Sequence, residues 1–247
     1  MLSGAATPAE RERLEHRLIG LVGIQEEFTA GRFARLAHAE IDGLLAEGRR
    51  PILVGGTGLY MRAALSELDM RPAVPSEVRA TVEAELAERG PAALHAELAP
   101  EFASGVHPND RKRIARLTEL ARLGIAAHSS AERLWSEALR VPTTLVGLTM
   151  EPDALRTRIE ARVDGMVEAG AREDAFSADA GGASRTARAA IGFKELLVGD
   201  VEEMKRAQWR FARRQLTWMR RMEDVHAIDR TGRPDADVAA EIAALLD

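Results

Sequence analysis

The sequence predicts an α/β protein, a parallel sheet flanked by helices, with an all-helical insertion subdomain. Short apolar runs alternate with helical periodicity toward both ends of the chain, which is the pattern of βαβ units. The stretch between them shows helical periodicity only, and the low aromatic content of 4% also favours helices. We expect residues 1–66 and 141–247 to form the α/β core and residues 67–140 to form the insertion.

The composition excludes several classes of protein. The chain has 247 residues, ordinary globular composition and a net charge of −5, which argues against a uniformly basic nucleic-acid binder. It has no cysteine, so disulfides and thiolate metal sites are excluded. No apolar run approaches the roughly 20 residues that span a bilayer. The six histidines are scattered, so we expect no protein metal site. We also expect a cytoplasmic location, no membrane partner and a monomer.

The N-terminal part of the chain reads as strand, helix, strand. Residues 17–22 are an apolar run typical of a strand, and residues 32–47 have helical periodicity that ends at Gly48. Residues 51–54 form a second apolar run, and a further helix is expected at residues 58–66. Because the connections are short, we expect a βαβ unit with parallel strands.

The rest of the chain gives a helical block and then a return to the α/β pattern. In the block, helices are expected at 76–88, with Ser76 as cap, and at 92–98, 111–123 and 131–139. The pattern then predicts a strand at 143–148, helices at 152–169, 186–197 and 201–222, and a strand at 225–228.

A glycine-rich turn, Gly55-Gly56-Thr57-Gly58, joins an expected strand to an expected helix. Such a turn leaves backbone N–H groups at a helix N-terminus, where they bind anions and phosphates in particular. The alternative is a purely structural turn. The sequence is not Gly-x-x-x-x-Gly-Lys-[Ser/Thr], and no such phosphate loop occurs in these 247 residues.

Two groups of basic residues lie at helical spacing. Arg158 and Arg162 are four residues apart, so they share one face of a helix and repel each other. Either Glu160, Asp164 and solvent offset this repulsion, or one guanidinium stabilises a bound anion. A similar cluster starts the helix at 111–123, where Lys112, Arg113 and Arg116 form either a solvated face or a binding site.

The most concentrated basic element is residues 205–221, with seven basic residues and no acidic one. Trp209, Ala212, Leu216 and Met219 form the apolar stripe of this helix, while its basic residues recur every three to four positions. A basic face with no acidic residue to neutralise it is better explained by a phosphate-backbone partner than by solubility.

Together these segments resemble the tRNA dimethylallyltransferase (tRNA isopentenyltransferase) family. The matches run in family order over essentially the whole chain. They are Gly4-Ala-Ala-Thr-Pro8 with His16-Arg-Leu-Ile19, Pro51-Ile-Leu-Val-Gly-Gly-Thr-Gly-Leu-Tyr60, Pro75-Ser-Glu-Val-Arg79, Asn109-Asp-Arg-Lys-Arg-Ile-Ala-Arg116, Arg158-Ile-Glu-Ala-Arg-Val-Asp164, Arg188-Ala-Ala-Ile-Gly-Phe-Lys194 and Ala212-Arg-Arg-Gln-Leu-Thr-Trp-Met-Arg220.

The resemblance implies a P-loop-NTPase-like core whose helical insertion clamps a tRNA anticodon stem-loop. It implies transfer of a dimethylallyl group from dimethylallyl diphosphate to N6 of an adenosine beside the anticodon, with Mg²⁺ helping to neutralise the leaving diphosphate. By position it assigns catalysis to Arg162 and Thr57, and diphosphate binding to the same two residues with Gly55 and Gly56. The residues it assigns to tRNA contacts are Thr57, Arg79, Lys112, Arg113, Arg116, Gly192, Lys194, Arg213, Arg214, Gln215 and Arg220.

The sequence also departs from the family pattern. The family's first strand, its Gly-rich loop with Lys and Ser/Thr, and an Asp-Ser-x-Gln-type motif that holds the general base would all precede Met1. Trp209 stands where an arginine is common, and Arg32 where an acidic residue is usual. We therefore expect an N-terminally shortened member whose Mg²⁺ ligands lie in that loop and whose own transfer activity is little or none. The alternative functions are a non-catalytic tRNA-binding module and, less well supported by the basic helix, a small-molecule kinase-like protein.

Overall fold

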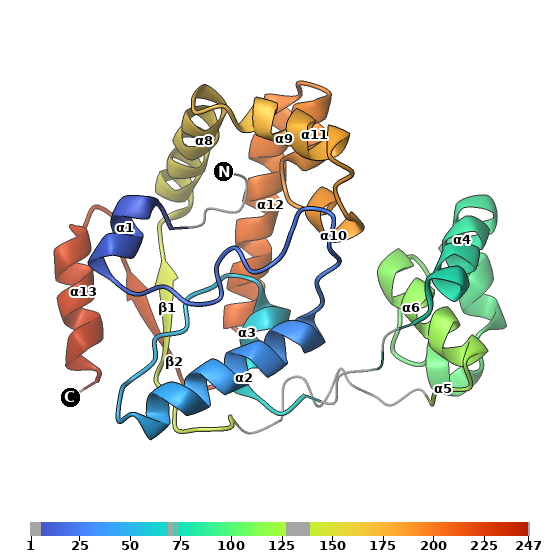
Figure 1. Cartoon of the computed structure of the whole chain (residues 1–247), viewed down its shortest axis with the longest axis horizontal. Coiled ribbons are helices and arrows are strands. Elements are labelled where there is room, and N and C mark those ends of the chain that lie inside the picture. The colour runs from blue at the N-terminus through green and yellow to red at the C-terminus, as the bar shows by residue number, and fades with distance from the viewer. Residues whose placement is uncertain (1–5, 69–71, 73, 127–138, 247) are drawn as a thin grey trace. The chain divides into compact units, whose positions relative to one another are not determined.

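The computed structural model describes residues 6–68, 72, 74–126 and 139–246. The chain divides into two compact units (Figure 1). Residues 1–68 and 137–247 form the first, which we call the core unit, and residues 69–136 form the second, which we call the helical unit.

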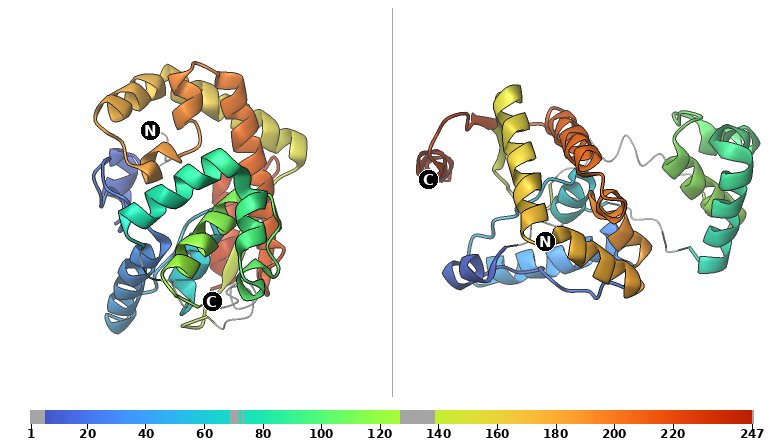
Figure 2. Two further views of the ribbon diagram at one scale, coloured as in Figure 1. Left: turned by 90° about the vertical axis from the view of Figure 1, so that its right-hand side faces the viewer. Right: turned by 90° about the horizontal axis from the view of Figure 1, so that it is seen from above.

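Three helices begin the core unit: α1 (Pro8–Arg13), α2 (Ala30–Ala46) and α3 (Gly58–Leu65). The hydroxyl of Thr29 caps α2 by accepting a hydrogen bond from the backbone N–H of Arg32. The buried stripe of α2 consists mostly of alanines, which allow α3 to pack closely beside it (Figures 1 and 2). These observations confirm the expected helices near residues 32–47 and 58–66.

A two-stranded parallel sheet lies in the second half of the core unit. Strand β1 (Leu145–Thr149) pairs with β2 (Val225–Asp229) in a register that runs from Leu145 opposite Val225 to Thr149 opposite Asp229. The strands confirm the expected ones at 143–148 and 225–228. The helices around them are α8 (Pro152–Glu168), α9 (Ala171–Ala180), α10 (Arg185–Arg188), α11 (Phe193–Leu197), α12 (Val201–Met219) and α13 (Asp235–Ala244).

Helix α12 is the element on which the core unit is built. It packs against α8, α11 and α3, and it runs through the middle of this unit in Figure 1. The apolar cluster that joins α12 to α8 and α11 has Val163, Leu196 and Met204 at its centre, all essentially without solvent exposure. The helices at 186–197 and 201–222 were expected to be longer: the first is two short helices around Gly192, and the second ends at Met219.

Two expected strands are wrong. Residues 17–22 include Leu18 and Gly20 with φ of 60° and 66°, in the left-handed region that an extended strand does not use. Residues 51–54 pair with no strand among the described residues, and Ile52 and Val54 are 75% and 87% exposed. The N-terminal βαβ unit is therefore not formed in the described part of the chain.

The helical unit contains α4 (Ser76–Glu97), α5 (Pro100–Ala103) and α6 (Arg111–Arg122) (Figure 2). Helix α4 is kinked at Gly90, where φ is 79° just before Pro91, so it corresponds to the two helices expected at 76–88 and 92–98. The cap of α4 is Pro75 and not Ser76. Val82 and Leu86 of α4 are buried and pack against Ile114 of α6. The helix expected at 131–139 falls almost wholly outside the described residues.

Four helices were not expected from the sequence: α1, α5, α9 and α13. All four are short, and mostly small or charged residues leave them a weak apolar stripe. Within the described part of the chain, no helix combines the length and the apolar character needed to cross a bilayer.

Candidate functional site

The glycine-rich turn lies directly against the C-terminal half of α12. A Cβ placed on Gly56 would overlap the side-chain amide of Gln215, and a Cβ placed on Gly58 would overlap the indole of Trp218. Both glycines are therefore required for the close approach of the turn to the helix. This packing supports the structural interpretation of the turn. It also brings the turn next to the basic helix, which the sequence did not predict.

A cavity of about 240 Å³ opens at the same turn. Its lining is formed by Phe33, Leu53, Val54, Gly55, Gly56, Thr57, Tyr60 and Met61. Burial raises the pKa of the Tyr60 hydroxyl, which therefore stays protonated at neutral pH. Thr57 is the N-cap of α3, but its side chain makes no capping hydrogen bond, so its hydroxyl is not used by the helix. The cavity combines an apolar wall with the hydroxyls of Thr57 and Tyr60 and the backbone of a glycine turn.

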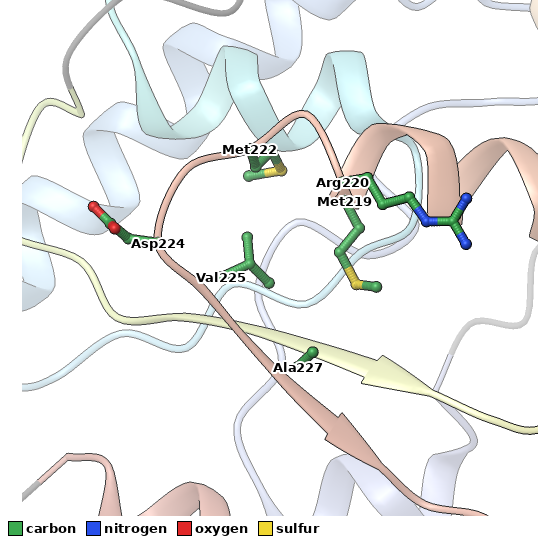
Figure 3. Close-up of a pocket in the computed structure, with 6 residues that line it drawn as sticks. All are labelled: Met219, Arg220, Met222, Asp224, Val225 and Ala227. Carbon is green, nitrogen blue, oxygen red and sulfur yellow. The ribbon is translucent and has the colours of Figure 1, made fainter.

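A second hollow, of about 330 Å³, lies where α12 ends and β2 begins (Figure 3). Met219, Met222, Val225 and Ala227 give it a mostly apolar lining, completed by Arg220 and Asp224. Figure 3 shows the side chains of Arg220 and Asp224 pointing away from each other. Arg220 is thus exposed at the end of α12 and is not neutralised by the nearest acidic residue of this hollow.

The basic face of α12 is neutralised over its N-terminal half, contrary to expectation. Lys205 pairs with Asp164 of α8 at 2.8 Å and with Glu202 at 3.1 Å. Glu203 accepts from Arg206 at 2.7 Å and from Arg210 at 2.5 Å. The neutralising carboxylates come from the first turn of α12 and from α8, both outside residues 205–221.

The C-terminal half of α12 keeps its positive charge. Arg213, Arg214 and Arg220 are exposed, and none of them forms an ion pair with another described residue. The guanidinium of Arg214 lies over the ring of Phe211, with its carbon 5.6 Å from the ring centroid. Gln215, between these arginines, turns inward to Gly56. The cationic surface is therefore smaller than expected and is placed next to the glycine turn.

On α8, neither Glu160 nor Asp164 offsets the charge repulsion between Arg158 and Arg162. Glu160 pairs with Arg156 at 3.3 Å, and Asp164 pairs with Lys205. Arg158 and Arg162 are exposed and pair with no described acidic residue, which leaves solvent or an external anion as their counter-charge. Arg162 does not line the cavity at the glycine turn, although α8 and α3 both pack on α12.

In the helical unit, the four basic residues assigned to RNA contacts differ in their surroundings. Arg79 of α4 and Arg116 of α6 both pair with the buried carboxylate of Glu119, at 3.6 Å and 3.1 Å. Arg113 is exposed and lies 3.6 Å from Asp110, and Lys112 is exposed without a partner among the described residues. Glu119 was missed from the sequence, because its contact with Arg79 is made across two helices.

The Gly192 segment forms the start of α11. Gly192 has φ of 100° and donates its backbone N–H to the carboxylate of Glu195 at 3.1 Å. The positive φ requires glycine at this position. Lys194 projects into solvent with a side chain 83% exposed, and its amine lies 3.5 Å from Glu195. The start of α11 thus presents one exposed amine at the surface.

Among the described residues, no three His, Asp or Glu side chains converge as metal ligands. No ligand set for Mg²⁺ is assigned among the described residues, and no chemical step is assigned to the ion.

Comparisons with known proteins give one consistent result. The sequence profile of the IPP transferase family matches residues 1–222. The tRNA dimethylallyltransferase of Thermobifida fusca is 41% identical over 234 residues, which cover 89% of this chain and 72% of that protein. The enzyme of the same name from Streptomyces avermitilis is 39% identical, covering 89% of this chain and 74% of its own.

Solved structures agree in fold. The tRNA isopentenylpyrophosphate transferase of Bacillus halodurans superposes with a TM-score of 0.67 at 30% identity, covering 99% of this chain and 81% of that chain. A eukaryotic dimethylallyltransferase acting on tRNA superposes with a TM-score of 0.73, and its 22% identity supports likeness of fold alone. The α/β architecture, with its small parallel sheet and many helices, is the one found in these structures.

Proposed function

The chain belongs to the IPP transferase family, and we propose that it acts on tRNA, transferring a dimethylallyl group from dimethylallyl diphosphate to N6 of an adenosine beside the anticodon. The observation that carries this proposal is the family match over residues 1–222, together with relatives named tRNA dimethylallyltransferase at about 40% identity. The packing of the glycine turn on the cationic end of α12 agrees with it.

The chemistry requires an anion site and a channel for the prenyl chain. An adenine amine is a weak nucleophile, so the diphosphate must leave with its developing charge stabilised. The groups we propose for this role are the backbone of Gly55 and Gly56, the Thr57 hydroxyl, which makes no capping hydrogen bond, and the exposed guanidinium of Arg162. The apolar wall of the cavity, from Phe33 to Met61, suits a short branched hydrocarbon.

The RNA contacts are proposed for exposed and half-buried cations. On the core unit these are Arg213, Arg214 and Arg220, with Gln215 between them, and Lys194 beside Gly192. On the helical unit, which we propose to clamp the anticodon stem-loop, they are Arg79, Lys112, Arg113 and Arg116. A base that reacts must leave its stack, and contacts to the surrounding phosphates hold the RNA while it does so.

Binding and transfer can be tested on one RNA. The protein is incubated with dimethylallyl diphosphate, Mg²⁺ and a synthetic anticodon stem-loop that carries an adenosine beside the anticodon. The RNA is then digested to nucleosides, which are identified by mass spectrometry. N6-dimethylallyladenosine supports the proposal. Binding of the stem-loop without this product supports the non-catalytic tRNA-binding module, and the absence of both overturns a role in tRNA modification.

A further inference from the structure

A buried carboxylate lies between two arginines in the helical unit. Glu119 of α6 is 4% exposed. Its Oε2 accepts a hydrogen bond from Nη1 of Arg116 at 3.1 Å, and its Oε1 lies 3.6 Å from Nε of Arg79 on α4. The same carboxylate therefore pairs with one arginine of its own helix and with one arginine of α4.

In this triad, the carboxylate and the two guanidiniums stabilise one another. A buried carboxylate is costly unless it is paired and hydrogen-bonded, and two guanidiniums side by side repel each other unless an anion lies between them. Arg116 is fixed further because its Nη2 donates to the backbone carbonyl of Pro72 at 2.7 Å. Long arginine side chains lose rotamer entropy when a ligand immobilises them, and here part of that ordering is already present in the free protein.

The triad leaves donors available for an external anion. The ion pair of Arg79 runs through Nε, and its side chain donates no hydrogen bond to another described residue, so its terminal N–H groups are free to bind. The side chains of Arg79 and Arg116 are 27% and 30% exposed, which keeps part of each guanidinium at the surface. A guanidinium held in this way is suited to a two-pronged contact with phosphate.

Given the proposed tRNA function, on which this step rests, we infer that Glu119 is a positioning residue for RNA binding. It touches no RNA itself. Its carboxylate holds Arg79 and Arg116 in the orientation in which they contact the phosphates of the RNA.

The test uses the sign of the effect of Glu119→Gln. This change removes a negative charge, so a simple charge effect makes RNA binding tighter. Misplaced arginines instead weaken it, and we expect an affinity for the stem-loop about 3- to 10-fold lower. The slope of log affinity against log salt falls by roughly 0.7–0.9 for each phosphate that the protein no longer neutralises, so it should fall by about that amount or twice it. Binding is measured by fluorescence anisotropy over a salt series on the whole chain.

Glu85 provides a matched control. It lies on α4 of the same unit, between Arg122 at 2.5 Å and Arg89 at 3.9 Å, and neither of these arginines is assigned to RNA. Glu85→Gln removes the same charge from a similar pair of ion pairs, and it should leave the RNA affinity unchanged or slightly raised. Thermal unfolding of both variants separates a general loss of fold from a loss of positioning.

A coupling measurement completes the design. In the background Arg79→Ala/Arg116→Ala, Glu119→Gln should cause no further decrease in RNA affinity, because Glu119 acts through those two arginines. If Glu119→Gln does not fold, Glu119→Asp keeps the charge and shortens the reach, and the same decrease in affinity and slope is expected.

The results have distinct meanings. The inference is overturned when Glu119→Gln, or Glu119→Asp in its place, binds the stem-loop at least as tightly as the parent with an unchanged slope. It is also overturned when the decrease persists in the double-alanine background. A parent protein that does not bind the stem-loop overturns the proposed function itself.

Discussion

The backbone of Gly58, the first residue of α3, lies directly against the indole ring of Trp218 on α12. A methyl group at this position would overlap the ring, and Gly56, two residues earlier, meets Gln215 in the same way. The glycine turn and the cationic end of α12 therefore form one packed structure. A change in either element is expected to move the other.

Gly58→Ala should destabilise the fold. The added Cβ meets the body of the Trp218 ring, which cannot move aside without disturbing α12, and overpacking of this kind costs about 1–3 kcal/mol. Thermal and urea unfolding measure the loss. Gly43→Ala is the control, because Gly43 lies inside α2 with no heavy atom near its Cβ position. There alanine should stabilise the helix by about 0.5–1 kcal/mol. Equal effects of the two changes would show that Trp218 does not constrain Gly58.

The sequence was informative where local pattern decides the structure. Helices α2, α3, α8 and α12 were predicted because each has a clear apolar stripe, a cap or a glycine stop. Strands β1 and β2 were predicted because both are short apolar runs beside such helices. The same reasoning failed at Ile52 and Val54, because an apolar run forms a strand only where a neighbouring strand accepts its hydrogen bonds.

The candidate site was less predictable, because charge depends on tertiary neighbours. The seven basic residues at 205–221 were correctly counted, but Asp164 on α8 neutralises Lys205 from a different helix. The pairing of Arg79 with Glu119 is likewise invisible in the sequence, where the two are forty positions apart. The local pair of Arg116 and Glu119, three apart on one helix, was the signal that could have revealed it.

Stability should depend on Glu203 in a pH-dependent way. Arg210 and Arg206 hold the pKa of the Glu203 carboxyl below its ordinary value of 4.5. A lowered pKa contributes stability above the unfolded value, and this contribution is lost as the pH falls through the folded value. The melting temperature of Glu203→Gln should therefore lie below that of the parent at neutral pH, and the difference should vanish as the pH falls below 4.5 and through the lowered pKa of the folded state. Glu223→Gln, which removes an exposed carboxylate without a described partner, is the control. A difference that persists in acid would point to packing and not to charge.

Arg162 should act on the diphosphate and not on the fold. Its guanidinium is exposed and pairs with no described acidic residue, so Arg162→Ala removes no internal ion pair of the described structure. A hydrogen bond to a charged group contributes about 1.5–3 kcal/mol, so the affinity for inorganic pyrophosphate should fall by roughly 10- to 100-fold. Isothermal titration calorimetry measures it. Arg156→Ala changes the same helix at an arginine already paired with Glu160 and should leave this affinity unchanged. Arg162 is misassigned if its variant loses RNA affinity while pyrophosphate binding is retained.

The two halves of α12 should differ in their contribution to RNA binding, although both are rich in arginine. Arg213 and Arg214 are exposed and have no acidic partner among the described residues, whereas Arg206 and Arg210 share Glu203. Arg213→Gln/Arg214→Gln should therefore weaken stem-loop binding by roughly 10- to 100-fold at low salt. It should also lower the slope of log affinity against log salt by about 1.4–1.8, the value for two phosphate contacts.

The matched variant Arg206→Gln/Arg210→Gln removes the same charge from the same helix. Its salt slope should stay close to that of the parent, because these two arginines are already neutralised and release few counterions from RNA. Its melting temperature should fall instead, since Glu203 loses both partners. Anisotropy titrations and melting curves of the two variants give the comparison. Identical salt slopes for the two would mean that the position of the charge along α12 does not matter, and that the RNA senses only the net charge of the protein.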